Sequence, residues 1–290
     1  MVSNEDQILL IGGSGQLGWY LWQGLSNVGS VVSTSRRTGS QDGLYYDASK
    51  SFSGLDFSDW KLVVYAAGLS SVSDCERRMA LSERVNFVSP VEVAREVSKS
   101  GGHFVFVSSS AANEYQAMSV EQARESHCRG DVGASAYGLH KYLAEQELLK
   151  LENTLVLRLS KVALPNWKLL RHWVSRLQVG GEIEAFDDHF ISPISIAIIV
   201  QAFTAVSTER ANGIIEISAQ NQCSYVEAAR MLAQELGQSE NLITPTSAAS
   251  VLDGRHIFRH AVLNSQRAEK LLGFRMPLAL DVLKPYALIK

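Results

Sequence analysis

Short hydrophobic runs bounded by turn residues alternate with longer mixed stretches through the first half of the chain. Runs of this kind, rich in β-branched and aromatic residues, are typical of parallel strands that are covered on both faces. Five of them predict strands: Gln7–Ile11, Val31–Ser35, Leu62–Ala66, Phe104–Val107 and Leu155–Leu159. The stretches between them predict three helices: Gln16–Ser26, Ala80–Ser98 and Ala136–Leu151. This alternation predicts an α/β fold with a doubly wound parallel sheet.

The pattern changes after Pro165. Two helices and two strands are predicted there: Trp167–Leu177, Ser195–Val206, Ile183–Phe186 and Ile214–Ile217. An amphipathic helix, Tyr225–Leu236, follows the capping residue Ser224 and stops at Gly237. We therefore expect a sheet domain over residues 1–165 and a smaller C-terminal α/β lobe over residues 166–290. Some strands and helices of that lobe are expected to return to the first domain.

Composition and charge restrict the partners of the chain. Its 290 residues carry a formal net charge of -3, which gives no electrostatic signature for nucleic acid or a membrane surface. The longest apolar run, Ile194–Val206, is too short to span a bilayer. The three cysteines, Cys75, Cys128 and Cys223, lie far apart, which predicts free thiols in a reducing compartment. The start of the chain lacks the features of a secretory signal, so we expect a cytoplasmic protein with small-molecule partners.

A glycine-rich turn links the first predicted strand to the first predicted helix. It fits two spacings, Gly13-x-Gly15-x-x-Gly18 and Gly12-x-x-Gly15-x-x-Gly18. Glycines let a backbone approach a pyrophosphate, and the helix N-terminus supplies free N–H groups and a positive dipole end. The alternative is a tight strand-to-helix turn with no ligand. The position at the first strand favours a Rossmann-type dinucleotide site with the cofactor contacts Gly12, Ser14, Gly15, Gln16, Leu17 and Gly18.

Two arginines follow the second predicted strand. Sites for NAD usually place an acidic residue there to bind the ribose 2′-hydroxyl, whereas this chain has Arg36 and Arg37. Guanidinium groups form paired hydrogen bonds with phosphate oxygens. The sequence therefore predicts NADP(H) in preference to NAD(H), unless these arginines are only solvated loop residues.

A serine run, a tyrosine and a lysine form the candidate catalytic set. Ser108, Ser109 and Ser110 end the fourth predicted strand, and Tyr137 and Lys141 are one helical turn apart. A lysine ammonium beside a tyrosine stabilises the phenolate, which makes tyrosine useful as a proton carrier near neutral pH. Taken alone, a tyrosine and a lysine at this spacing are more often two side chains on the surface of a helix, with no catalytic role. After a dinucleotide loop it indicates oxidoreductase chemistry.

These motifs resemble those of the extended short-chain dehydrogenase/reductase family. The pieces that match are Gly12-x-x-Gly15-x-x-Gly18, Ala66-Ala67-Gly68, Asn86, Ser108-Ser109-Ser110, Tyr137-x-x-x-Lys141 and Val156-Leu157-Arg158-Leu159-Ser160. The stretches Gly15-Gln16-Leu17-Gly18, Phe186 to Pro193 and Ala261 to Ser265 look most similar to the dTDP-4-dehydrorhamnose reductase branch. The resemblance covers nearly the whole chain.

The resemblance implies roles for particular residues. Ser110, Tyr137 and Lys141 would be catalytic, with Ser110 in the family's serine or threonine position. Further cofactor contacts would be Asp47 near the adenine, Ala66, Ala67 and Gly68 along the ribose, Asn86, and Tyr137 and Lys141 themselves. The activity implied is NADP(H)-dependent reduction or epimerisation of a nucleotide-linked ketosugar, with no metal. A homodimer is compatible with the sequence.

The chain also departs from the family. The reductase branch commonly has Thr-Asp-Tyr where this chain has Ser110-Ala111-Ala112, and Asn264-Ser265 differs from the usual Leu-Asp-Thr. Ala111 and Ala112 cannot perform the acid–base work of the sugar-nucleotide dehydratases, which disfavours dehydration. These departures keep an alternative open, a catalytically idle NADP(H)-binding regulatory subunit of a partner enzyme.

Overall fold

A parallel sheet forms the centre of the protein. The computed structural model describes residues 7–36, 43–52, 55–258 and 261–288. Within them the sheet has seven strands in the order β3-β2-β1-β4-β5-β6-β11. Their bounds are β1 Gln7–Ile11, β2 Ser30–Ser35, β3 Gly43–Tyr45, β4 Leu62–Tyr65, β5 His103–Ser109, β6 Thr154–Leu159 and β11 Gly213–Ile217. All six neighbouring pairs are parallel, which confirms the predicted Rossmann-type fold.

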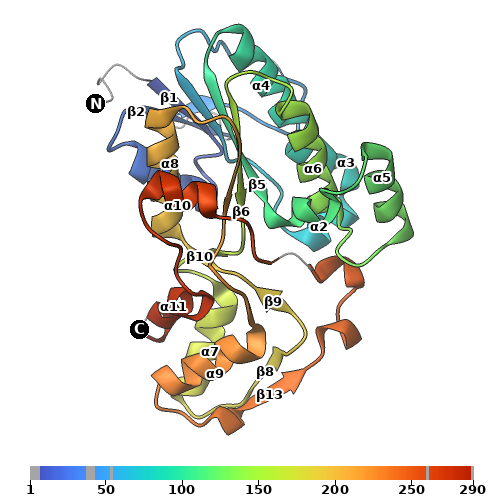
Figure 1. The fold of residues 1–290 in the computed structure, drawn as a ribbon, viewed down its shortest axis with the longest axis vertical. Coiled ribbons are helices and arrows are strands. Elements are labelled where there is room, and N and C mark those ends of the chain that lie inside the picture. The colour runs from blue at the N-terminus through green and yellow to red at the C-terminus, as the bar shows by residue number, and fades with distance from the viewer. Residues whose placement is uncertain (1–6, 37–42, 53–54, 259–260, 289–290) are drawn as a thin grey trace.

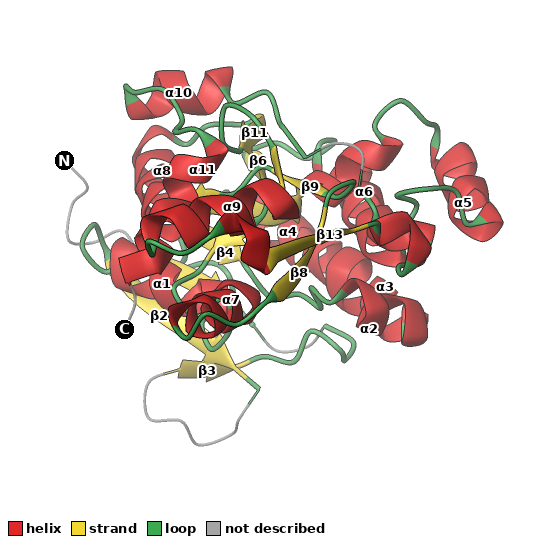
Figure 2. Ribbon diagram, turned by 90° about the horizontal axis from the view of Figure 1, so that it is seen from below, coloured by secondary structure: helices red, strands yellow, loops and turns green. Residues whose placement is uncertain are grey.

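Helices cover both faces of this sheet (Figure 2). On one face Leu10 packs in a cluster with residues of α1 (Gln16–Leu25), α8 (Ile196–Glu209) and α10 (Gln266–Leu272). On the other face its neighbour Leu9 packs with α4 (Ser89–Lys99) and α6 (Ala136–Leu148). Successive strand residues point to opposite faces, so burial on both sides explains the continuous apolar runs in the sequence.

A smaller lobe lies beyond the carboxyl ends of the strands, in the lower half of Figure 1. Its core is built by α7 (Lys168–Gln178), α9 (Tyr225–Glu235) and α11 (Ala279–Leu283), with β8 (Ile183–Phe186) paired to β13 (Ile243–Thr246). Ser224 caps α9, as the sequence indicated, and Glu227 completes a reciprocal capping box that was not predicted. Two further short pairs are β7 (Val162–Ala163) with β10 (Ile194–Ser195), between the sheet domain and the lobe, and β9 (Phe190–Ile191) with β12 (Cys223–Ser224), within the lobe.

Some elements were not predicted. Helix α5 (Val120–Arg129) is largely exposed, but its capping box of Ser119 and Gln122 and its left-handed stop at Gly130 were recognisable signals. The predicted helix over Ala80–Ser98 is interrupted. It consists of α3 (Met79–Glu83), a π-helical turn (Arg84–Val88) and α4, and is preceded by α2 (Val72–Arg77).

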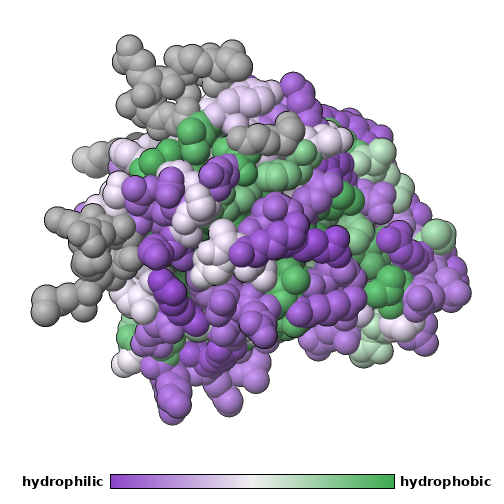
Figure 3. All heavy atoms as spheres, turned by 90° about the horizontal axis from the view of Figure 1, so that it is seen from above, coloured by the Kyte–Doolittle hydropathy of each residue, from purple (hydrophilic) through white to green (hydrophobic). Residues whose placement is uncertain are grey.

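Hydrophilic side chains cover much of the surface seen from above, with hydrophobic patches between them (Figure 3). Within the described ranges, no helix combines the length and the hydropathy needed to cross a membrane. Cys75 and Cys223 are buried, Cys128 is exposed, and all three thiols are free, in agreement with the prediction.

Candidate active site

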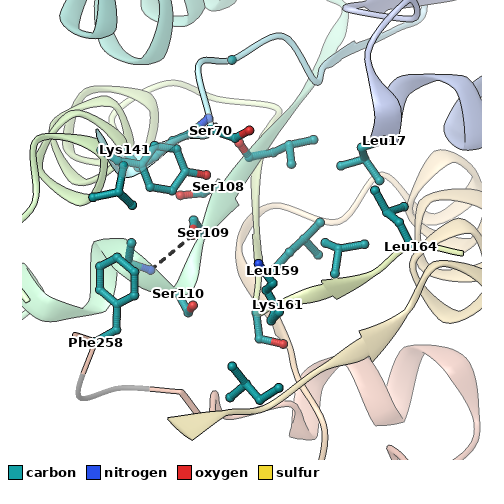
Figure 4. Close-up of a pocket in the computed structure, with 18 of the residues that line it drawn as sticks. Leu17, Ser70, Ser108, Ser109, Ser110, Lys141, Leu159, Lys161, Leu164 and Phe258 are labelled. Atoms are coloured by element: carbon teal, nitrogen blue, oxygen red, sulfur yellow. Dashed lines mark hydrogen bonds between the residues drawn. The ribbon is translucent and has the colours of Figure 1, made fainter. Parts of the chain in front are cut away.

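A cavity of about 590 Å³ opens where the sheet domain meets the lobe. Its walls come from the segments that follow β1, β4, β5 and β6, together with the start of α6 and the lobe strand β9. This is the carboxyl edge of a parallel sheet, where α/β folds place their ligands. In Figure 4, Lys141 and the serines are on one side, Leu17 and Leu164 on the other, and Lys161 lies beside Leu159 between them.

The cavity collects most of the predicted site residues. Ten of them line it: Gly15, Gln16, Leu17, Gly18, Ala66, Ala67, Gly68, Ser110, Tyr137 and Lys141. Five others are not among its lining residues: Gly12, Ser14, Arg36, Asp47 and Asn86. Arg37 lies outside the described residues.

The glycine turn is packed too tightly for side chains. Gly12 has a φ of 96°, and a Cβ there would come within 2.5 Å of the backbone nitrogen of Ala67. A Cβ on Gly18 would come within 2.1 Å of the carbonyl oxygen of Gly12. Gly15 precedes α1 without a side-chain cap, so the first N–H groups of this helix remain available. A turn packed in this way at an uncapped helix fits the pyrophosphate of a dinucleotide.

Asn86 holds the neighbouring turn in place from behind. Its side-chain amide donates to the carbonyl oxygen of Leu69 (3.0 Å), and its Oδ1 accepts from the N–H of Leu69 (3.1 Å). It lies in the π-helical turn that precedes Pro90, a residue that cannot donate to the carbonyl four residues earlier. This proline explains why the predicted helix is interrupted here. Asn86 therefore orients the turn that carries Gly68.

Helix α6 presents Tyr137 and Lys141 to the cavity. Ser135 caps the helix by accepting from the N–H of Gly138 (3.1 Å). Lys141 donates from Nζ to the carbonyl oxygen of Val107 (2.8 Å). Burial lowers the pKa of Lys141 to about 8, although the charge of Glu145 acts in the opposite direction. Lys141 therefore titrates close to neutral pH.

Tyr137 is held in its protonated form by burial. Burial raises the pKa of Tyr137 to about 12, against the effect of a hydrogen bond with the Ser109 side chain. Its hydroxyl therefore carries its proton at neutral pH. Ser109 also accepts from the N–H of Ala111 (3.3 Å) where β5 turns into a 3₁₀-helix, Ser110–Tyr115. Sequence reasoning passed over Ser109 because three adjacent serines give no sign of which one faces the tyrosine.

The two serines provide a matched test of this geometry. We expect Ser109→Ala to lower kcat by about 10²-fold, the scale for removing one positioned hydroxyl donor. Ser110→Ala is expected to have a smaller effect, because both serines line the cavity but Ser109 is the one whose side chain influences the pKa of Tyr137. Steady-state kinetics of both variants decide the order, and a larger loss in Ser110→Ala would support Ser110, the serine that the resemblance implies.

A buried ion network lies beneath Lys141. Arg158 pairs with Glu145 (2.6 Å) and with Glu216 (2.9 Å), and the Arg158 and Glu145 side chains are only 6% and 0% exposed. The Ser108 hydroxyl donates to Glu145 (2.5 Å). Ser108, the first serine of the run, is thus committed to the network.

Arg36 and Asp47 lie together at the ends of β2 and β3. The side chain of Asp47 accepts from the hydroxyl and the N–H of Ser49 (2.7 and 3.0 Å). These hydrogen bonds lower the pKa of Asp47, with a smaller contribution from the charge of Arg36. Arg36 is exposed at the carboxyl end of the strand next to β1, as the prediction of a cofactor contact requires.

Solved structures of similar fold come from sugar-nucleotide enzymes. The dTDP-4-dehydrorhamnose reductase of Yersinia enterocolitica has a TM-score of 0.77 and 18% identity, over 97% of this chain and 98% of that one. The Bacillus anthracis dTDP-4-dehydrorhamnose reductase in complex with NADP has a TM-score of 0.75 and 17% identity, over 98% and 99%. UDP-glucose 4-epimerase of Thermotoga maritima with UDP-glucose has a TM-score of 0.69 and 18% identity, over 97% and 98%.

No protein with curated annotation is detectably similar to the chain in sequence. The RmlD substrate binding domain family, in contrast, matches residues 6–284, nearly the whole chain. This match confirms the resemblance to the dTDP-4-dehydrorhamnose reductase branch of the extended short-chain dehydrogenases/reductases. The chain belongs to the RmlD substrate binding domain family.

Proposed function

We propose that the protein is an NADP(H)-dependent oxidoreductase that reduces or epimerises a nucleotide-linked sugar. One observation carries this proposal: a single cavity is lined by the glycine turn, by Tyr137 and Lys141, and by the serines at the end of β5. A volume of about 590 Å³ is within the usual range of small-molecule sites. The relatives of similar fold are named as enzymes of this class.

The cavity residues divide the chemistry between them. A bound nicotinamide would supply or accept the hydride. Tyr137, protonated at neutral pH, donates its proton to the oxygen of the substrate carbonyl as that oxygen gains negative charge. The Lys141 ammonium stabilises the phenolate that Tyr137 leaves behind. A serine hydroxyl, from Ser109 or Ser110, positions the carbonyl oxygen.

The test of this function is a panel of nucleotide sugars mixed with the purified protein and NADPH, followed by the absorbance of NADPH. Oxidation of NADPH with a 4-keto nucleotide sugar supports reduction, and interconversion of nucleotide sugars with bound cofactor supports epimerisation. No turnover with any member of the panel, together with a stoichiometric enzyme partner on co-purification, would instead support the regulatory-subunit alternative.

Cofactor preference gives a separate prediction. We expect NADPH to bind more tightly than NADH, because a guanidinium on the 2′-phosphate makes charge-assisted hydrogen bonds worth about 1.5–3 kcal/mol each. Arg36→Ala should then weaken NADPH by about ten- to a hundredfold and leave NADH nearly unchanged. The double Ala variant of Arg36 and Arg37 extends the test to the neighbouring position.

The measurement is the pair of dissociation constants for NADPH and NADH in each variant. The preference should shrink as salt rises, because Arg36 is exposed. Equal binding of NADPH and NADH by the wild-type protein would show that the arginines are solvated loop residues.

A further inference from the structure

One cation in the cavity has no role in the chemistry above. The lining residues include two lysines, Lys141 and Lys161, and no aspartate or glutamate. Lys141 belongs to the tyrosine–lysine pair. Lys161 comes directly after β6 and before β7, and in Figure 4 it lies beside Leu159, between the side of the cavity with Lys141 and the side with Leu17.

Lys161 is held in place without an anionic partner. Its Nζ lies 4.8 Å from the centre of the Trp167 ring, which is itself packed edge-on against Tyr286. Within the described part of the chain, Nζ makes neither a hydrogen bond nor an ion pair. The side chain is open to the cavity, yet the surrounding walls desolvate it and lower the pKa of Lys161. A cation confined without a counter-ion is a strong attractor for an anion.

Asp188, the acidic residue that precedes the cavity residue His189, is already engaged in hydrogen bonds. Asp188 accepts hydrogen bonds from the Ser247 hydroxyl and the N–H of Ala248 (both 2.5 Å) and from the N–H of Ala249 (3.2 Å). His189, which follows it, lines the cavity beside Lys161. Burial lowers the pKa of His189, the charge of Asp188 opposes this effect, and the charge of Lys161 adds to it. This wall therefore presents a cation and an imidazole, with no carboxylate among its lining residues.

We propose that Lys161 binds the diphosphate of the nucleotide-sugar substrate. This inference rests on the proposed function and adds how the substrate is oriented. A nucleotide sugar carries its diphosphate on the anomeric carbon, so the diphosphate lies across the sugar ring from a reacting carbon at Tyr137, and Lys161 is the second lysine that lines the same cavity. The same oxyanion chemistry could be supplied by a carboxylate on the sugar, and the experiment separates the two sources.

The experiment compares Lys161→Met with wild type and a matched control. Methionine keeps the unbranched length that packs on Trp167 and removes only the charge. Lys168→Met is the control, because Lys168 is an exposed lysine at the start of α7 outside the cavity. Calorimetry on the NADP⁺-loaded proteins measures the binding of UDP, dTDP, UDP-glucose and UDP-glucuronic acid, and a separate titration measures NADP⁺.

We expect Lys161→Met to weaken both nucleoside diphosphates by about ten- to a hundredfold, the scale of one charge-assisted hydrogen bond. Lys168→Met should bind them like wild type, Lys161→Arg should retain most of the affinity, and NADP⁺ binding should be the same in all four proteins. In kinetics the loss should appear in KM for the nucleotide sugar, with kcat nearly unchanged.

Three results would overturn the assignment: equal binding of UDP and dTDP by wild type and Lys161→Met, a loss confined to UDP-glucuronic acid, or no binding of either diphosphate by wild type. The second result would show that Lys161 contacts a carboxylate on the sugar and not the diphosphate. The proposed function is tested separately by the panel of nucleotide sugars. It fails if no member of the panel oxidises NADPH or is interconverted. Weakened UDP binding in Lys161→Met would still support the diphosphate contact in that case.

Discussion

Tyr137→Phe is expected to lower kcat by about 10²- to 10⁴-fold, the range for removing a positioned general acid. The phenylalanine keeps the ring, so cofactor binding should remain close to that of wild type. What disappears is the hydroxyl that carries the transferred proton and whose pKa the Ser109 side chain influences. The measurement is single-turnover reduction with NADPH and the substrate found in the panel, together with the dissociation constant for NADP⁺.

Tyr142→Phe is the matched control. Tyr142 lies on the same helix, but its hydroxyl donates to the carbonyl oxygen of Met118 (2.5 Å) and is not part of the cavity. Its loss should leave kcat near that of wild type. Turnover by Tyr137→Phe at the rate of Tyr142→Phe would remove Tyr137 from the mechanism.

The pH dependence of wild-type turnover examines the same pair. A lysine is charged below its pKa, and that of Lys141 is lowered to about 8 by burial. Tyr137, whose pKa is raised to about 12, stays protonated through this range. Turnover should therefore fall as the pH rises through about 8, because the ammonium that stabilises the phenolate is lost. A flat profile across this pH would show that the charge of Lys141 is not required.

Arg158→Met is expected to lower the free energy of unfolding by about 3–5 kcal/mol. The substitution leaves Glu145, which is fully buried, and Glu216, which is 16% exposed, without their shared cation. Desolvated carboxylates that lose their partner are strongly destabilising, even though an intact buried pair contributes little by itself. Urea unfolding of wild type and variant measures the difference.

Arg95→Met is a control on the same helix pair. Arg95 bonds Glu147 (3.0 Å), two residues after Glu145, but the Arg95 side chain is 55% exposed. Water and salt screen such a pair, so we expect a loss of at most about 1 kcal/mol. Similar losses in the free energy of unfolding of the two variants would contradict the expectation that burial of its carboxylate partners makes the loss of Arg158 more destabilising.

The sequence predicts the sheet well because a strand that is buried on both faces needs a continuous run of apolar residues, which is visible in the sequence. The strands Gln7–Ile11 and Ile183–Phe186 have the predicted bounds. Strand β3 was not predicted, since it has three residues at the edge of the sheet and both Leu44 and Tyr45 are exposed. An edge strand this short has no alternating or continuous apolar pattern to recognise.

The site was predictable only where a motif fixes local geometry. The glycine turn marks the junction between a strand and a helix, and the tyrosine–lysine spacing places both side chains on one face of a helix. Which serine meets Tyr137 depends on how β5 bends into the following 3₁₀-helix, and no residue pattern records that bend. Lys161 is distinguished by the absence of carboxylates among the residues that line the cavity. These lining residues belong to segments far apart in the sequence, so the sequence alone does not bring them together.

The path of the chain has a consequence for dissecting the protein. After leaving the sheet at β6 it enters the lobe, returns through α8 and β11, enters the lobe again at α9, and returns once more at α10. A fragment ending at residue 165 would lack β11, leaving β6 as an open edge, and would also lose α8 and α10 from the face that carries Leu10. The complementary fragment would carry those same elements with no sheet to cover. The two parts are thus interlaced by the backbone, and neither corresponds to a segment that could be exchanged as a cassette.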